Sequence, residues 1–248
     1  SPENPSQEDA DHAAQTFHGV SETRDYSIRT DEAAEVLQEI GVLDGQGRAW
    51  IAVLDDIGRH SASARIMEEV PVPDHGLRRV EIAVPPLKGE KMDLVLQKCT
   101  ELGVSAFHLI PARRSVARMD GETGGKLSRY RAIVASAVEQ CCGFTLPEVR
   151  IWPDLGDFLS SISCPGRYIA WEEEERTSCH HITANAHPCV LASGPEGGFE
   201  AQEVALYQEH GFLSVSLGPR ILRAETAPLM MAAVAIWGMC SSFLMYGV

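Results

Sequence analysis

The stretch Ser216–Trp237, SLGPRILRAETAPLMMAAVAIW, joins a polar loop to an apolar segment near the end of the 248-residue chain. In the apolar half, hydrophobic residues recur at helical spacing, which predicts a helix packed against the protein core. The residues expected on its buried face are Leu229, Met230, Ala233, Ile236 and Trp237. The segment therefore predicts that a loop following a strand leads into a buried terminal helix.

The polar half concentrates charge in a short loop, with Arg220, Arg223 and Glu225 directly before the helix. Such charges are costly to bury unless they are solvated or paired. The loop is either a surface ion cluster or part of a ligand site. Thr226 is expected to cap the helix, with Pro228 inside the first turn, where its missing N–H costs nothing.

Upstream of this segment, apolar patterns of helical and strand type alternate, which indicates an α/β layer with a mostly parallel sheet. Gly103, Gly143 and Gly211 are expected to end three of the helices. The predicted helices cover 89–104, 124–143 and 199–211, and the predicted strands cover 105–112, 166–173, 188–194 and 212–218.

The N-terminal part has a different composition. Residues 1–17 are polar, acidic and proline-containing, which is typical of a disordered tail. Residues 18–85 contain short alternating segments that predict a β-rich domain, and Pro85–Pro86 is the expected boundary with the α/β domain at 86–248. Its predicted strands cover 48–57, 63–70 and 78–85, with a glycine-rich turn at 43–48.

A second polar loop, SGPEGGF at Ser193–Phe199, directly follows a predicted strand, where parallel sheets bind ligands. Its three glycines let the backbone approach a ligand closely. The loop matches neither the dinucleotide nor the triphosphate fingerprint. The alternative is an ordinary turn between a strand and a helix.

Five motifs, in this order, resemble the RsmE type of SPOUT methyltransferase, a family that methylates N3 of a uridine in small-subunit (16S-type) ribosomal RNA. The resemblance covers about residues 86–248. The motifs are KGEKMDLVLQKCTELGV from Lys88, RRSV from Arg113, AVEQC from Ala137, GPEGGF from Gly194 and LGPRILRAETA from Leu217.

This resemblance implies a trefoil-knotted α/β domain that binds S-adenosylmethionine, works as a homodimer and follows a small PUA-like β-barrel. The methyl donor would lie against three successive loops and the strand before one of them. The cofactor-binding residues carried over are Trp171, Glu172, Leu191, Gly194, Pro195, Glu196, Gly197, Gly198, Leu217, Gly218, Ile221, Leu222 and Thr226.

The resemblance also gives the charged loop residues a chemical role. Uridine N3 must lose its proton before it can attack, and guanidinium groups can stabilise the resulting anion. Arg220 and Arg223 are the expected clamps on uracil oxygens or on phosphate. Glu225 is either their orienting partner or the base, and Glu196 is the second candidate base. This chemistry requires no metal.

The distribution of charge restricts where RNA could bind. The formal net charge is −14, yet residues 88–131 carry nine basic and five acidic side chains. Only this segment is basic, so it supplies the expected phosphate contacts. The alternative for each is an ordinary solvated charge. The candidates are Lys88, Lys91, Arg113, Arg114 and Arg118.

The N-terminal region departs from the family pattern because acidic residues stand where arginines are expected. A non-catalytic RNA-binding or ribosome-assembly protein is therefore the second hypothesis, and the same chemistry on another RNA is the third. Seven irregularly spaced cysteines favour a reducing compartment, either cytoplasmic or organellar. His187 and Cys189 fit no zinc spacing, and neither a metal nor a membrane is expected as a partner.

Overall fold

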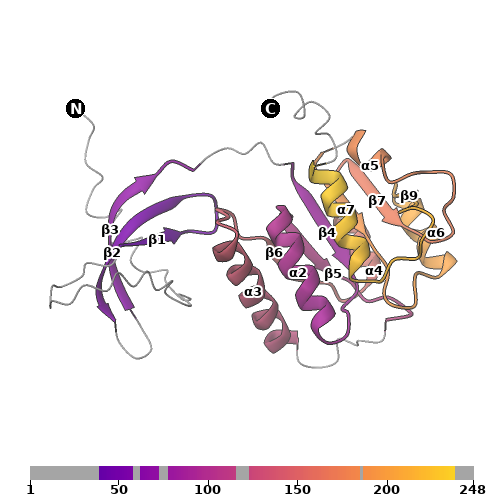
Figure 1. Cartoon of the computed structure of the whole chain (residues 1–248). Helices are drawn as coiled ribbons and strands as arrows, with labels where there is room; N and C mark the ends of the chain where they lie inside the picture. The colour runs from indigo at the N-terminus through magenta and orange to yellow at the C-terminus, as the bar shows by residue number, and fades with distance from the viewer. Residues whose placement is uncertain (1–38, 58–61, 73–77, 116–122, 185–186, 238–248) are drawn as a thin grey trace. The chain divides into compact units, whose positions relative to one another are not determined.

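A computed structural model of the chain describes residues 39–57, 62–72, 78–115, 123–184 and 187–237 (Figure 1). The chain divides into two units, residues 1–73 and 74–248. The predicted tail, Arg118 and residues 238–248 lie outside the described part. No helix in the described ranges is long and apolar enough to cross a membrane.

The first unit contains a three-stranded antiparallel sheet in the order β1-β2-β3. The strands are β1 (Glu39–Leu43), β2 (Ala49–Ile57) and β3 (Ala62–Val70). The predicted strands at 48–57 and 63–70 are confirmed, whereas β1 was not predicted. Gly45 and Gly47 have positive φ, and Asp44 Oδ1 accepts the backbone N–H of Gln46 and of Arg48, so the predicted turn is also confirmed.

The second unit is built on a six-stranded sheet in which every pairing is parallel, in the order β6-β5-β4-β8-β7-β9. All residues of β4, β5 and β8 are buried, as expected for a parallel sheet covered on both faces. The strands are β4 (Val80–Val84), β5 (Ala106–Leu109), β6 (Glu148–Ile151), β7 (Gly166–Ala170), β8 (Cys189–Ala192) and β9 (Leu213–Val215).

Helices cover both faces of this sheet and enclose two hydrophobic clusters (Figure 1). One cluster includes Met92, Val134 and Met231, and the other includes Phe158 and Tyr207. The first face carries α2 (Glu90–Leu102), α3 (Thr123–Gln140), α5 (His181–Ala184) and α7 (Thr226–Trp237), and the second carries α4 (Leu155–Ser161) and α6 (Ala201–Glu209).

Glycines end two of the predicted helices where expected. After α2, Gly103 has a φ of 101°, and its N–H donates to the Thr100 carbonyl. Gly211 has a φ of 82° beyond α6, and its N–H donates to the Gln208 carbonyl. Only glycine adopts such backbone angles at low cost, so the sequence predicted these two helix ends correctly.

The structure corrects the assignment of residues 78–85. This segment was predicted to belong to the small β-rich domain, but β4 pairs with β5 and β8 in the centre of the parallel sheet. The boundary between the units lies at residue 73 rather than 85. The error arose because Pro85–Pro86 was taken as the boundary, whereas this proline pair follows β4 directly and lies within the second unit.

The buried face of α7 agrees with the prediction at Ile236 and differs from it at the other four positions. Met231, Ala232, Ala235 and Ile236 are buried, whereas half of Trp237 is exposed. The helix is apolar almost all round, so its sequence pattern does not determine which side packs inward.

Candidate functional site

A cleft of about 920 Å³ opens at the carboxyl ends of β7, β8 and β9. It is lined by the three loops that follow these strands, together with Lys91 at the start of α2. The chain continues from β8 to α6 on one face of the sheet, but from β7 and β9 to α5 and α7 on the other. Loops that diverge in this way leave a crevice at the strand ends, which is the usual ligand site of such sheets.

Backbone hydrogen bonds hold two of these loops side by side. Trp171 N–H donates to the Val215 carbonyl at 3.2 Å, and Ser216 N–H donates to the Thr177 carbonyl at 2.7 Å. The Ser216 carbonyl accepts the N–H of Cys179 at 3.0 Å. The loop after β9 is thus fixed against the loop after β7.

The glycines of the loop after β8 allow close contacts with its neighbours. Gly198 has a φ of 68°, and a Cβ there would lie 3.1 Å from Glu172 Oε1. A Cβ on Gly197 would lie 3.0 Å from the Cβ of Arg114. The loop could not keep this path with larger residues at these positions, so the glycines set the shape of the cleft wall.

The cleft wall is rich in carboxylates, with Glu172, Glu174, Glu175 and Glu196 among its lining residues. Glu174 Oε1 accepts the backbone N–H groups of Arg176 and Thr177, which lowers the pKa of Glu174 below its ordinary value. The same lining contains four cations, Lys91, Arg176, Arg220 and Arg223, so the cleft offers partners for both positive and negative groups of a ligand.

Lys91 lies between two carboxylates from different loops. Its Nζ is 3.7 Å from Glu196 Oε1 and 3.6 Å from Glu225 Oε2. Arg223, whose side chain is 83% exposed, lies 3.9 Å from the other oxygen of Glu225. The charged residues in the polar half of Ser216–Trp237 therefore belong to an ion cluster at the cleft rather than to an isolated surface group.

Most residues predicted to contact a cofactor line this cleft. Those that line it are Trp171, Glu172, Gly194, Pro195, Glu196, Gly198, Leu217, Gly218, Ile221 and Leu222, and the predicted clamps Arg220 and Arg223 line it as well.

Four predicted residues lie elsewhere. Leu191 is completely buried inside β8, and Gly197 faces Arg114. Glu225 is buried and does not line the cleft, and its Oε2 lies 3.6 Å from Lys91 Nζ. Thr226 is exposed and is the first residue of α7, so it does not occupy the predicted cap position before the helix. A linear motif shows which loop is involved, but not which side chains of that loop face inward.

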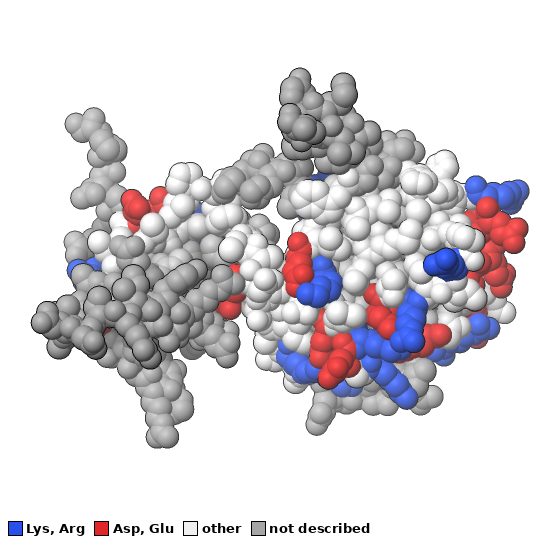
Figure 2. All heavy atoms as spheres, viewed as in Figure 1, with Lys and Arg blue, Asp and Glu red and all other residues white. Residues whose placement is uncertain are grey.

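Two of the predicted phosphate contacts are instead engaged with α6. The backbone N–H of Arg113 donates to Glu203 Oε1, and its guanidinium donates to Glu200 and Gln202. Arg114 donates to the Gly197 carbonyl and pairs with Glu200. On the face shown in Figure 2, basic and acidic side chains of this unit are interspersed rather than gathered in one continuous basic patch.

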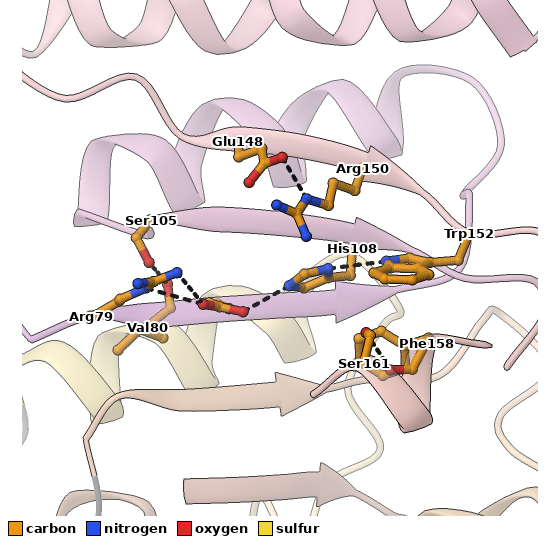
Figure 3. Close-up of polar contacts among 10 residues, drawn as sticks. Arg79, Val80, Ser105, His108, Glu148, Arg150, Trp152, Phe158 and Ser161 are labelled. Atoms are coloured by element: carbon orange, nitrogen blue, oxygen red, sulfur yellow. Dashed lines mark hydrogen bonds and ion pairs between the residues drawn. The ribbon is translucent and has the colours of Figure 1, made fainter. Parts of the chain in front are cut away.

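Sequence reasoning missed a buried polar chain on the second face of the sheet (Figure 3). Glu81 Oε2 lies 2.8 Å from His108 Nε2, and Trp152 Nε1–H donates to His108 Nδ1 at 3.0 Å. Since Nδ1 accepts, Nε2 carries the hydrogen that is donated to Glu81. This bond is the main cause that lowers the pKa of Glu81.

A small cavity of about 160 Å³ adjoins this chain at the amino ends of the strands, where Arg79 and Pro188 contribute to its lining. It therefore lies at the opposite end of the sheet from the large cleft. In the sequence, the hydrogen-bonded set Glu81–His108–Trp152 is indicated by one feature, the charge of Glu81 within an apolar strand.

The parallel sheet with a ligand cleft at its strand ends defines an α/β enzyme class. Within that class, residues 75–236 match the family described as the RNA methyltransferase domain, and the chain belongs to this family.

The chain is similar to proteins named ribosomal RNA small subunit methyltransferase E, which confirms the resemblance inferred from the motifs. The Bacillus subtilis protein is 30% identical over 86% of this chain and 90% of its own length. The Synechocystis protein is 33% identical over 77% of this chain, and the match spans 63% of that protein.

A solved structure of the Neisseria gonorrhoeae protein of the same name, bound to S-adenosyl methionine, gives a TM-score of 0.72. Its sequence identity is 33%, and the match covers 81% of this chain and 84% of that chain.

Proposed function

We propose that this protein is an S-adenosylmethionine-dependent RNA methyltransferase that methylates N3 of a uridine in small-subunit ribosomal RNA. The observation that carries the proposal is the cleft formed by the loops after β7, β8 and β9. The family and the relatives named above support the reaction class.

The residues of the cleft fit the proposed methyl donor. The volume of about 920 Å³ is within the range of small-molecule sites. The carboxylates of Glu172 and Glu175 complement the positive charge of a sulfonium, and Gly218, beside which a Cβ would meet nothing within 4 Å, keeps the backbone accessible. When bound, S-adenosylmethionine supplies an activated methyl group.

The remaining task of the protein is to hold and deprotonate the uracil. Arg220 and Arg223 lie on the cleft and are exposed, so their guanidinium groups can reach uracil oxygens or phosphate. Glu196 and Glu225, which both pair with Lys91, are the candidates for the base and the orienting group.

We further propose that the α/β unit is a SPOUT domain with a trefoil knot, that two copies form a homodimer, and that the first unit is a PUA-like RNA-docking domain. The hydrogen bonds between residues 177–179 and Ser216 support the knot, because they hold the last loop against an earlier one. The antiparallel β1–β3 sheet supports the docking domain. We place the enzyme where its ribosomal substrate is made, in the cytoplasm or an organelle.

Methyl transfer to isolated small subunits and to bare ribosomal RNA tests the function directly. We expect tritium from labelled S-adenosylmethionine to appear in N3-methyluridine after nucleoside analysis, and Arg223→Ala to reduce it strongly. Calorimetric binding of S-adenosylmethionine without any transfer would favour the alternative, a non-catalytic assembly protein, which the net charge of −14 makes worth testing. A failure to bind the donor would remove the basis of the proposal.

A further inference from the structure

Lys91 connects three separate segments of the cleft. It belongs to α2, whereas its two partners, Glu196 and Glu225, belong to the loops after β8 and β9. Both partner distances, 3.7 and 3.6 Å, are those of ion pairs rather than of hydrogen bonds. The ammonium therefore acts on both carboxylates through its charge.

The position of Lys91 is unfavourable for the helix that carries it. A cation in the first turn of a helix opposes the helix dipole. Gly89, at the cap position of α2, has no side chain to satisfy the first N–H groups. The two carboxylates offset this cost, so the arrangement is explained better by the cleft than by the stability of α2.

The two carboxylates have different environments. Glu196 lines the cleft, and its Oε1 accepts the backbone N–H of Lys88 at 3.2 Å, which fixes its orientation. Glu225 is only 9% exposed and does not line the cleft. Its buried Oε2 accepts no hydrogen bond from the described residues, and it faces the ammonium of Lys91 instead.

We propose that Glu196 is the catalytic base for uracil N3, that Lys91 is the positioning residue that holds it, and that Glu225 is the buried counter-charge of Lys91. This assignment rests on the proposed function and resolves which of the two carboxylates takes the proton. Glu196 is oriented and lines the cleft, whereas Glu225 is buried outside the cleft lining, and its Oε2 lies 3.6 Å from Lys91 Nζ.

The proposed methyl transfer couples removal of the N3 proton to formation of the N3–carbon bond. The Glu196 carboxylate takes the N3 proton, and the N3 electron pair forms a bond to the methyl carbon. The carbon–sulfur bond breaks with its electron pair on sulfur, which leaves a neutral thioether. Arg223, on the same cleft, is the guanidinium that would stabilise the charge that develops on the uracil oxygens.

Substrates with a more acidic N3 distinguish the two carboxylates. Fluorine at C5 withdraws electrons and makes N3–H easier to remove, so a missing base matters less. With ordinary small subunits, we expect Glu196→Gln to lower kcat by roughly 100-fold or more and Glu225→Gln to have a much smaller effect. With subunits assembled on RNA transcribed with 5-fluorouridine triphosphate, the Glu196→Gln defect should shrink at least about tenfold.

The role of Lys91 is tested by separating kcat from KM. We expect Lys91→Met to lower kcat with little change in KM for the small subunit, and Lys91→Arg to restore much of the activity. Lys98→Met is the matched control, because Lys98 is on the same helix and pairs only with nearby Glu101 among the described residues. It should leave both constants unchanged. If Lys91→Met does not fold, as judged by thermal unfolding, Lys91→Gln replaces it.

Two results would overturn the assignment while leaving the proposed function intact. One is a larger defect in Glu225→Gln, relieved by 5-fluorouridine, since Glu225 would then be the base. The other is a raised KM with unchanged kcat in Lys91→Met, since Lys91 would then be a phosphate contact. Absence of methyl transfer by the unmodified protein would overturn the proposed function itself.

Discussion

At Gly198 the backbone has a φ of 68°, a conformation that residues with a Cβ adopt only with strain. The neighbouring Glu172 carboxylate fills the space where a Cβ would be, because the two would be 3.1 Å apart. The absence of a Cβ at Gly198 therefore determines both the backbone path of the glycine loop and the position of the Glu172 carboxylate in the cleft.

Gly198→Ala should weaken S-adenosylmethionine binding about tenfold or more, because strain of about 1 kcal/mol adds to displacement of Glu172. Isothermal titration calorimetry measures the affinity. Gly124→Ala is the control, since a Cβ at Gly124 in α3 meets nothing within 4 Å. It should leave binding unchanged and slightly stabilise the helix. Wild-type affinity in Gly198→Ala would show that the loop tolerates a different path.

The Glu81–His108–Trp152 chain is a second case in which single residues decide a local structure. Glu81 and His108 are 5% and 4% exposed, and each hydrogen-bonding group of the chain has a partner. A buried carboxylate without such partners would be strongly destabilising. These hydrogen bonds among Glu81, His108 and Trp152 thus allow a charged residue inside β4.

Glu81→Gln should reduce the dependence of stability on acidic pH. The hydrogen bond from His108 is the main cause that lowers the pKa of Glu81 in the folded state. A lowered folded pKa contributes stability above the unfolded value, near 4.3, and this contribution is lost as pH falls through the folded pKa.

Urea unfolding between pH 6 and pH 3 checks this expectation. At pH 6 the variant should be less stable than the wild type by about 2 kcal/mol, because a hydrogen bond to a charged group is lost. The difference should narrow at the acidic end of the series. Two curves that stay parallel over the whole range would contradict the assignment of this pH dependence to Glu81.

At the scale of elements, the first turn of α6 is attached to the loop that follows β5. Glu200 and Glu203 form a capping box, and Glu203 also accepts the backbone N–H of Arg113 from the loop after β5. The same side chain therefore caps a helix and anchors a neighbouring loop.

Glu203→Ala should lower the free energy of unfolding by about 1–2 kcal/mol, because two backbone N–H groups lose their acceptor. Chemical denaturation gives the value. Glu209→Ala at the exposed end of α6 is the control and should be neutral or slightly stabilising, since an acidic residue there opposes the helix dipole. Equal losses in the two variants would argue against an anchoring role for Glu203.

The sequence predicted most of the elements of the α/β unit, because amphipathic periods and glycine stops are local features. It did not predict β6, α4 or α5, which are short and carry little periodicity. It assigned β4 to the wrong unit, since pairing partners are not local. In the site, the sequence identified the loops but not the orientation of Glu225 and Thr226. The orientation of Glu225 depends on its contact with Lys91, and that of Thr226 depends on where α7 begins.

At the scale of the whole molecule, an RNA partner has to approach a chain with a net charge of −14. Arg113 and Arg114 share the single carboxylate of Glu200, which offsets one of their two positive charges. Arg220 is exposed on the cleft and makes no ion pair within the described part of the chain. The net attraction for phosphate therefore depends on a few unpaired cations.

Arg220→Ala should reduce the slope of log affinity against log salt by about one, as expected for a lost phosphate contact. Arg113→Ala is the comparison and should change the slope much less, because its guanidinium already faces Glu200. Fluorescence anisotropy with a labelled small-subunit RNA fragment, titrated at several salt concentrations, measures both slopes. An equal decrease in the two variants would mean that Arg113 leaves α6 to bind RNA.

The order of the cleft segments along the chain has a consequence for biosynthesis. The contributing segments follow one another as Lys91, then 171–178, then 194–199 and finally 216–224. A nascent chain that has emerged from the ribosome up to residue 215 already contains all six strands of the parallel sheet, but lacks the last wall of the cleft. The methyl donor can thus be bound only after translation has passed residue 215. Incomplete polypeptides would therefore not compete with the finished protein for the methyl donor.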